Sequence, residues 1–140
     1  MSRSIREIMK REVVTLSAGE RLSTVEDIMT LGGVRHIPVT RAGALVGVVT
    51  ERDLLRTSLS QLNAYGDDAR RAFLNGVEIE RVMSAPPVTI GPADSVERAA
   101  RIMAERKIGC LPVVDEAGQF VGLVTETDLL RHFAGLPPGS

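Results

Sequence analysis

The residues best suited to chemistry form a Thr-x-x-Asp pattern behind an apolar run, at Thr50 to Asp53 and again at Thr125 to Asp128. An ionised carboxylate only accepts hydrogen bonds, and its two oxygens can take both hydroxyl protons of a cis-diol such as that of ribose. Where a strand end meets a helix N-terminus, free backbone N–H groups also suit a polar or anionic ligand. The pattern therefore predicts a small-molecule site at each position.

The same pattern has a purely structural interpretation. A threonine at the N-cap and an aspartate three residues later form a capping box, in which each side chain bonds the other residue's backbone N–H. The two interpretations are compatible, and the pattern alone does not separate them. Asp53 and Asp128 are not expected to form a catalytic carboxylate pair, because each belongs to its own sequence copy.

Catalytic and metal-binding chemistry lacks its usual residues. No Ser-His-Asp set or glycine-rich phosphate loop accompanies the aspartates. His36 and His132 have no metal-ligand spacing around them, and Cys110 is the only cysteine, so a cysteine metal cluster or an internal disulfide is excluded. We predict no catalytic residues and no metal site, and an enzyme is the least supported class of function.

An internal duplication must supply the elements that position these residues. Residues 79–113 align with residues 5–39 at an offset of 74. After one inserted residue, 42–56 aligns with 117–131, with 11 of 15 positions identical. Composition alone would give about one match in such a window. Each copy has the pattern of a strand, an amphipathic helix, two strands around a turn and a final helix.

The order β-α-β-β-α, present twice, predicts an α/β fold of the α+β type. Neither copy has enough strands to bury its own faces. We therefore expect the two repeats to pack through their sheets with pseudo-twofold symmetry. Asp94, with Glu97 three residues later, is the predicted N-cap of the first helix in the second copy. The predicted parts are a first repeat at 1–62, a helical connector at 63–78, a second repeat at 79–134 and a tail at 135–140.

Composition excludes several partners. The net charge is −1, from 17 basic and 18 acidic residues spread along the chain, which gives no electrostatic footprint for nucleic acid or an anionic membrane. Only 3% of the residues are aromatic, too few for stacking on single-stranded nucleic acid. No stretch has the length of a membrane span or the apolar run of a signal peptide. With a single cysteine, we expect a cytoplasmic protein.

The doubled set of motifs resembles a tandem pair of CBS domains, the cystathionine-β-synthase type also called a Bateman module. The shared pattern is apolar-Pro-Val, then Gly, then apolar-Gly-apolar-Val-Thr-x-x-Asp-Leu-Leu, and it extends from Ile5 to about Phe133. The resemblance implies two pseudo-symmetric clefts between the repeats. In that family such clefts commonly bind AMP, ADP, ATP or S-adenosylmethionine, and no cofactor is required.

The resemblance also assigns roles to individual residues. Asp53 and Asp128 would hold the ribose, beside Thr50 and Thr125. Extended segments at the start of each repeat would line the base pocket, and residues around each Pro-Val would line the clefts. The predicted ligand-binding residues are Val14, Thr15, Arg35, His36, Ile37, Pro38, Thr50, Arg52, Asp53, Val88, Thr89, Gly109, Cys110, Leu111, Pro112, Thr125 and Asp128.

The copies differ where a phosphate would be met. The first copy offers Arg35, His36 and Arg52, whereas the second has Gly109, Cys110 and Thr127 at the matching positions. Because arginine binds phosphate through charge-assisted hydrogen bonds, we expect the first site to carry more of the phosphate affinity.

These observations favour a stand-alone regulatory module. It would sense an adenosyl ligand and signal to an unidentified partner protein by a shift between conformations. Exposed helix faces indicate a homodimer. The alternative is a scaffold or dimerisation module whose clefts hold no ligand.

Overall fold

The computed structural model describes residues 3–59 and 66–139, and the chain divides into two compact units. The first-repeat unit comprises Val14–Pro86, and the second-repeat unit comprises Met1–Val13 with Pro87–Ser140. Both units place helices against a small sheet, so the predicted α+β class is confirmed. The predicted boundary between the first repeat and the connector lies outside the described residues. No helix within the described part of the chain could cross a lipid bilayer.

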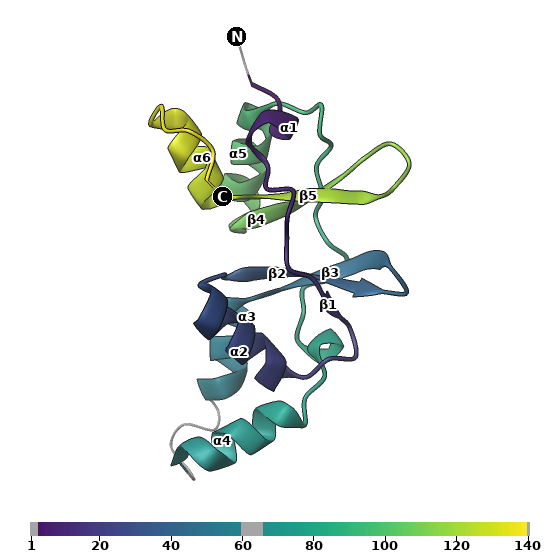
Figure 1. The fold of residues 1–140 in the computed structure, drawn as a ribbon, viewed down its shortest axis with the longest axis vertical. Coiled ribbons are helices and arrows are strands. Elements are labelled where there is room, and N and C mark those ends of the chain that lie inside the picture. The colour runs from purple at the N-terminus through teal and green to yellow at the C-terminus, as the bar shows by residue number, and fades with distance from the viewer. Residues whose placement is uncertain (1–2, 60–65, 140) are drawn as a thin grey trace. The chain divides into compact units, whose positions relative to one another are not determined.

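The first-repeat unit is built on a three-stranded sheet of order β1-β2-β3. Strand β1 pairs parallel to β2, and β2 pairs antiparallel to β3. Helices α2 and α3 lie on the same side of this sheet (Figure 1). The elements of the unit are β1 (Leu16–Ser17), α2 (Leu22–Gly32), β2 (His36–Arg41), β3 (Ala44–Thr50), α3 (Glu51–Leu59), α4 (Gly66–Asn75) and the short 3-10 helix η1 (Ile79–Arg81).

Local sequence explains this sheet and its helix. Ala42 and Gly43 both have positive φ, 52° and 82°, between the paired residues Arg41 and Ala44. Two central residues with positive φ are typical of a two-residue hairpin turn whose twist matches that of the strands. In α2, apolar residues recur at helical spacing and face the sheet. Leu22, Val25 and Met29 of α2 are buried with Ile37, Val39 and Val49 of the sheet.

Helix α4 follows the undescribed residues and packs on α2. Its Leu74 is fully buried in the core of the unit. Arg70 forms an ion pair with Glu26 of α2, and Arg71 donates to the same carboxylate at 2.7 Å. Burial would raise the pKa of Glu26, but the hydrogen bonds and positive charges of the two arginines outweigh it and lower the pKa. The helix is therefore attached to the unit by both apolar and charged contacts.

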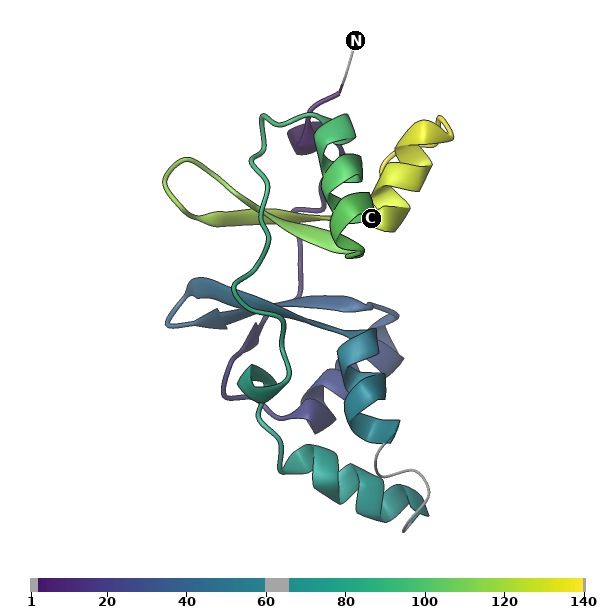
Figure 2. The ribbon, with the colours of Figure 1, turned by 180° about the vertical axis from the view of Figure 1, so that it is seen from behind.

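The second-repeat unit is built on the two-stranded sheet β4-β5. Its helices α1, α5 and α6 lie on one side of this sheet, as the view from behind also shows (Figure 2). The elements of the unit are α1 (Ile5–Ile8), α5 (Val96–Arg106), β4 (Cys110–Val114), β5 (Phe120–Thr125) and α6 (Glu126–Phe133).

The compact units exchange the opening segment of each repeat. Ile5 and Met9, at the start of the first copy, are buried in the core of the second-repeat unit. Their counterparts Ile79 and Met83 pack in the core of the first-repeat unit. An apolar segment that opens one sequence copy thus completes the hydrophobic core built by the other.

The predicted N-cap of α5 is wrong by one residue. Ser95 is the N-cap, and its Oγ accepts a hydrogen bond of 3.1 Å from Arg98 N. Asp94 instead accepts a hydrogen bond of 2.8 Å from Gly91 N and closes the preceding turn. Both residue types cap helices well, and the backbone path into the helix decides which of them does so.

Candidate functional site: two strand-to-helix junctions

In the first-repeat unit, the Thr50–Asp53 junction is a reciprocal pair of hydrogen bonds. Thr50 N donates to Asp53 Oδ2 at 2.9 Å, and Asp53 N donates to Thr50 Oγ1 at 3.2 Å. Strand β3 ends at Thr50 and α3 begins at the next residue. The capping interpretation is therefore confirmed here. Asp53 is 7% exposed, and its Oδ1 has no hydrogen-bond or ionic partner among the described residues.

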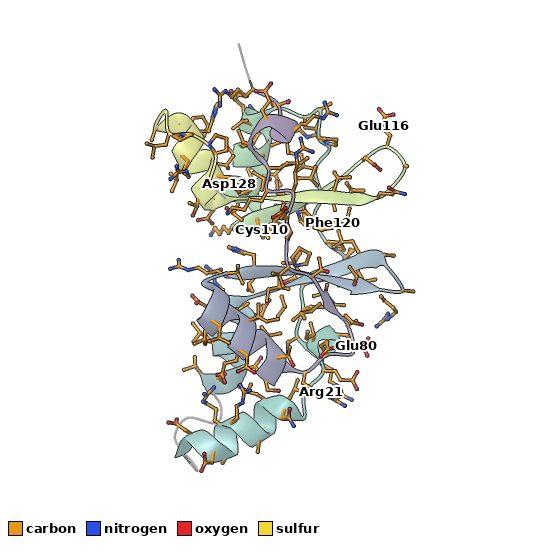
Figure 3. All side chains as sticks on the ribbon, viewed as in Figure 1. Arg21, Glu80, Cys110, Glu116, Phe120 and Asp128 are labelled. Atoms are coloured by element: carbon orange, nitrogen blue, oxygen red, sulfur yellow. The ribbon has the colours of Figure 1, made fainter. Side chains whose placement is uncertain are left out.

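In the second-repeat unit, the Thr125–Asp128 junction has the same frame with more contacts. Asp128 Oδ2 accepts from Thr125 N at 2.8 Å and from Thr125 Oγ1 at 3.0 Å. Asp128 N donates back to Thr125 Oγ1 at 3.4 Å, which completes the capping box of α6. In addition, Lys10 Nζ lies 3.5 Å from Asp128 Oδ1. Figure 3 shows Asp128 at the start of α6, in the same unit as Cys110 on β4.

The residues just before each Pro-Val adjoin these junctions. Glu51 N, at the start of α3, donates to Arg35 O at 2.9 Å. Glu126 N, at the start of α6, donates to Gly109 O at 3.0 Å. In the sheets, His36 pairs with Thr50 and Cys110 pairs with Thr125. The predicted residues Arg35, His36, Gly109 and Cys110 are thus brought beside the aspartates.

Ile37 and Leu111 occupy the next position along each strand. Both side chains are fully buried in the cores of their units. Pro38 and Pro112 follow them and are also buried. A ligand at the junction would meet the backbone of these residues, and their role in binding stays a prediction.

The predicted base-pocket segments run toward the same ends of the strands. Leu16 pairs with Val39 in parallel, so Val14 and Thr15 extend from that pair toward the His36 end of β2. In the second copy, Ile90 pairs with Val113 in parallel, and Val88 and Thr89 precede it. Val14 is 49% exposed and Thr15 and Thr89 are exposed, whereas Val88 is half-buried.

The cations predicted for phosphate binding lie on the surface of the first-repeat unit. Arg35 precedes β2, and Arg52 lies in the first turn of α3 next to Asp53. Both side chains are exposed. In the second-repeat unit the matching positions are Gly109 and Thr127, so the difference between the copies is present at the junctions.

The sequence analysis did not predict that a further segment pairs with each apolar-Gly-apolar strand. This crossing segment, at Lys10 in one unit and at Ser84 in the other, forms an isolated antiparallel bridge with the strand. Lys10 exchanges backbone hydrogen bonds of 2.8 and 2.9 Å with Leu123, and Ser84 exchanges bonds of 2.9 and 3.1 Å with Val48. The signal for this crossing was the glycine in each strand, because glycine in a strand often marks a close backbone approach. The duplication aligns Lys10 with Ser84 and shows that the crossing segments differ there.

The glycines have a steric reason to be glycine. A Cβ added at Gly122 would lie 2.7 Å from Lys10 O, and one added at Gly47 would lie 2.8 Å from Ser84 O. Both distances are shorter than Cβ contacts in folded proteins. The Gly in the repeated motif therefore admits the crossing segment that brings Lys10 beside Asp128.

Burial sets the chemistry of Cys110. Burial raises the pKa of the Cys110 thiol to about 12, and the negative charge of Glu126 adds to the rise. A reactive cysteine needs thiolate character, so this side chain behaves as a small apolar group. Within residues 3–59 and 66–139, no three His, Cys, Asp or Glu side chains gather closely enough to hold a metal ion.

Comparison with known proteins places these features in a family. The model of the CBS domain matches residues 5–60 and 79–135. The chain belongs to the CBS-domain family. The two matched segments cover both copies of the duplication, and thereby both Thr-x-x-Asp junctions.

This CBS-domain chain is similar to an uncharacterized protein and to a solved CBS domain pair. The chain is 35% identical to protein MJ1225 of Methanocaldococcus jannaschii over 93% of its own length, and it spans 47% of that relative. It shares a TM-score of 0.80 and 25% identity with the CBS domain pair of protein MJ0100, covering 96% of this chain and 98% of that one. That structure is a complex with 5′-methylthioadenosine and S-adenosyl-L-methionine.

The second solved structure supports the fold alone. CBSX2, solved in complex with AMP, has a TM-score of 0.77 and 23% identity, covering 94% of this chain and 96% of that one. Each of these two solved structures contains an adenosyl compound.

Proposed function

We propose that this chain is a regulatory module that binds an adenosyl ligand, such as AMP, ADP, ATP or S-adenosylmethionine, at its Thr-x-x-Asp junctions. The observation that carries the proposal is a buried carboxylate at a strand-to-helix junction in both repeats, held by its own threonine. A carboxylate fixed in this way is pre-organised to accept the hydroxyl protons of a ribose. The ligands of the MJ0100 domain pair contain such a ribose.

The module would act by changing the populations of its conformations. A ligand shifts such an equilibrium only by its difference in affinity for the two states. A partner protein that prefers one of these states would then sense the ligand. The chain would work without catalysis and without a required cofactor, in the cytoplasm, where a lone buried cysteine stays reduced.

A thermal-shift panel tests the proposal. At about 100 times its Kd, a ligand stabilises the fold by about 2.7 kcal/mol, which is several degrees in Tm for a chain of this size. The panel contains AMP, ADP, ATP, S-adenosylmethionine, 5′-methylthioadenosine and guanine nucleotides. We expect a shift with at least one adenosyl compound.

A charge-matched pair of variants separates the junctions from general electrostatics. Asp53→Asn/Asp128→Asn keeps an acceptor for each cap but removes both charges, and it should abolish the shift. Asp67→Asn/Asp68→Asn removes two exposed carboxylates from α4 and should leave the shift unchanged. If no compound shifts the Tm, or if both double variants keep the full shift, a ligand-free scaffold becomes the better interpretation.

The two sites should differ toward phosphate. Arg35 and Arg52 are exposed beside Asp53, so Arg35→Ala/Arg52→Ala should weaken AMP binding more than adenosine binding. Arg98→Ala/Arg101→Ala removes two exposed arginines from α5 and serves as the control. Equal losses for AMP and adenosine would contradict a phosphate contact.

We also propose that two copies of the chain associate through α3 and α6. Leu55 and Leu59 on α3 are 55% and 60% exposed, and Leu130 and Phe133 on α6 are 67% and 59% exposed. Apolar side chains at helical spacing suit a partner helix. Light scattering should give a dimer for the parent chain and a monomer for Leu55→Glu/Leu130→Glu. Leu31→Glu, at an 88% exposed position on α2, should remain dimeric.

A further inference from the structure

We propose that Lys10 makes the second-repeat junction the weaker of the two sites for a ribose. Its ammonium forms an ion pair with the carboxylate of Asp128, which would hold the diol. The inference rests on the proposed function and adds a residue that decides which repeat is filled first. Lys10 lies outside the repeated motif and reaches Asp128 from the crossing segment.

Asp128 has hydrogen bonds at two of its acceptor positions and a cation beside the others. A carboxylate has about four positions at which it can accept a hydrogen bond. Oδ2 takes two hydrogen bonds, from Thr125 N at 2.8 Å and from Thr125 Oγ1 at 3.0 Å. The Lys10 ammonium lies 3.5 Å from Oδ1. The two hydrogen bonds leave about two positions, and the ammonium beside Oδ1 competes for them with a cis-diol that donates both hydroxyl protons.

Asp53 has more acceptor positions without a partner than Asp128, although both residues are buried. Among the described residues, the one hydrogen bond that this carboxylate accepts is that of 2.9 Å from Thr50 N to Oδ2. Among the described residues, no cation lies within 4.0 Å of this carboxylate. About three of its four positions remain, which is sufficient for both hydroxyl groups of a ribose.

The difference between the junctions comes from one side chain in a shared backbone frame. Lys10 pairs with Leu123, and its counterpart Ser84 pairs with Val48 through the same two backbone hydrogen bonds. A serine side chain is too short to reach the aspartate as lysine does. The Lys10 side chain is 30% exposed while that of Asp128 is 2% exposed. The ammonium can therefore move to water when a ligand arrives, and the cost of breaking the pair appears as weaker binding.

Site-resolved NMR titration with adenosine tests this inference in the full chain. Adenosine carries the diol without phosphate, so any attraction between Lys10 and a phosphate does not contribute. The amides of Thr50 and Thr125 each donate to their own aspartate and report the two sites separately. We expect adenosine binding about two- to fivefold weaker at Thr125 than at Thr50, which is the effect of one partly exposed ion pair.

Reciprocal exchange of the two residues should reverse this order. Lys10→Ser should tighten adenosine binding at Thr125 by about two- to fivefold and leave Thr50 unchanged, while Ser84→Lys should weaken it at Thr50 by a similar factor. Arg11→Ser removes an exposed positive charge from the neighbouring residue and should change neither site.

Four results would overturn the inference. Unchanged adenosine binding at Thr125 in Lys10→Ser would show that the ion pair does not compete with the diol. Weaker binding of adenosine there would make Lys10 a ligand contact, and a loss confined to AMP would make it a phosphate contact. If neither amide responds to adenosine or AMP in any variant, the proposed function itself fails, and the inference fails with it.

Discussion

The Thr50–Asp53 and Thr125–Asp128 junctions share one backbone design and differ in the side chains around it. In both, a threonine caps a helix and an aspartate three residues later bonds back to the strand end. The first junction has exposed arginines nearby and an open carboxylate oxygen. The second has Cys110 in place of His36 and Lys10 paired with its aspartate. Duplication thus preserved the frame, and single substitutions changed the chemistry that each copy offers.

The largest expected effect concerns the reactivity of Cys110, which occupies the position of His36 in the other copy. Because burial raises the Cys110 pKa to about 12, iodoacetamide at about pH 8 should alkylate it at least about a hundredfold more slowly than an exposed cysteine. The control is Cys110→Ser/Thr127→Cys, which moves the thiol to an exposed position on α6. Similar alkylation rates in the two proteins would contradict a buried, protonated thiol.

The buried Cys110 thiol should make the free energy of unfolding depend on pH at high pH. The unfolded chain loses the thiol proton near its ordinary pKa of about 8.5, while the folded chain keeps it until about pH 12. The unfolded state therefore binds fewer protons between these values, and the free energy of unfolding falls as pH rises. Denaturant melts at increasing pH should show a smaller decline in Cys110→Ser than in the parent.

Adding a methyl group at the glycine beside each crossing segment should lower the free energy of unfolding by a similar amount in the two repeats. Gly47→Ala and Gly122→Ala each place a Cβ within 2.8 Å of a backbone oxygen, so each should lower the free energy of unfolding by about 1–3 kcal/mol. Urea denaturation measures the loss. Gly19→Ala, where no atom lies within 4 Å, should change stability little. A tolerated alanine at only one glycine would show that the two crossings differ in tightness.

The cap with more contacts, at Asp128, should contribute more to the free energy of unfolding than the cap at Asp53. Asp128→Ala removes hydrogen bonds from Thr125 N and Oγ1 and the partner of Lys10, so it should destabilise the protein by about 2 kcal/mol. Asp53→Ala removes one hydrogen bond from Thr50 N and should lose about 1 kcal/mol. Asp67→Ala, at an exposed position in the first turn of α4, controls for the loss of a helix-start charge. Equal losses at Asp53 and Asp128 would remove the energetic difference between the junctions.

The smallest expected effect is that of the ion pair on stability. Because the Lys10 ammonium remains partly in water, Lys10→Ser should lower the free energy of unfolding by less than about 1 kcal/mol. In about 1 M NaCl the gap between Lys10→Ser and the parent should narrow, since salt screens partly exposed charges. A loss well above that of Arg11→Ser at every salt concentration would instead indicate a packing role for the lysine stem.

Much of each repeat could be predicted locally. The apolar spacing of Leu22, Val25 and Met29 predicts the buried face of α2, and all three are buried. The Thr-x-x-Asp spacing predicts a capping box, and both junctions contain its hydrogen bonds. The predicted N-cap of α5, Asp94, is one residue before the actual N-cap, Ser95. Both residue types cap helices well, and only the path of the preceding turn decides which of them does so.

The duplication, the helix-strand-strand-helix order in each copy and the two aspartates at the junctions could be predicted from the order of amino acids. These features depend on periodicity and on contacts within a few residues, which the order of amino acids specifies directly. The predicted opening strand of the second copy is wrong, because Ile90 forms only an isolated bridge with Val113. Only the tertiary structure decided that the opening segment of each copy completes the core of the other unit, and that Lys10 therefore meets Asp128. Such contacts join residues far apart in the chain, and neither local propensity nor spacing carries that information. The two carboxylates, alike in their motifs, are thus unlike in their surroundings.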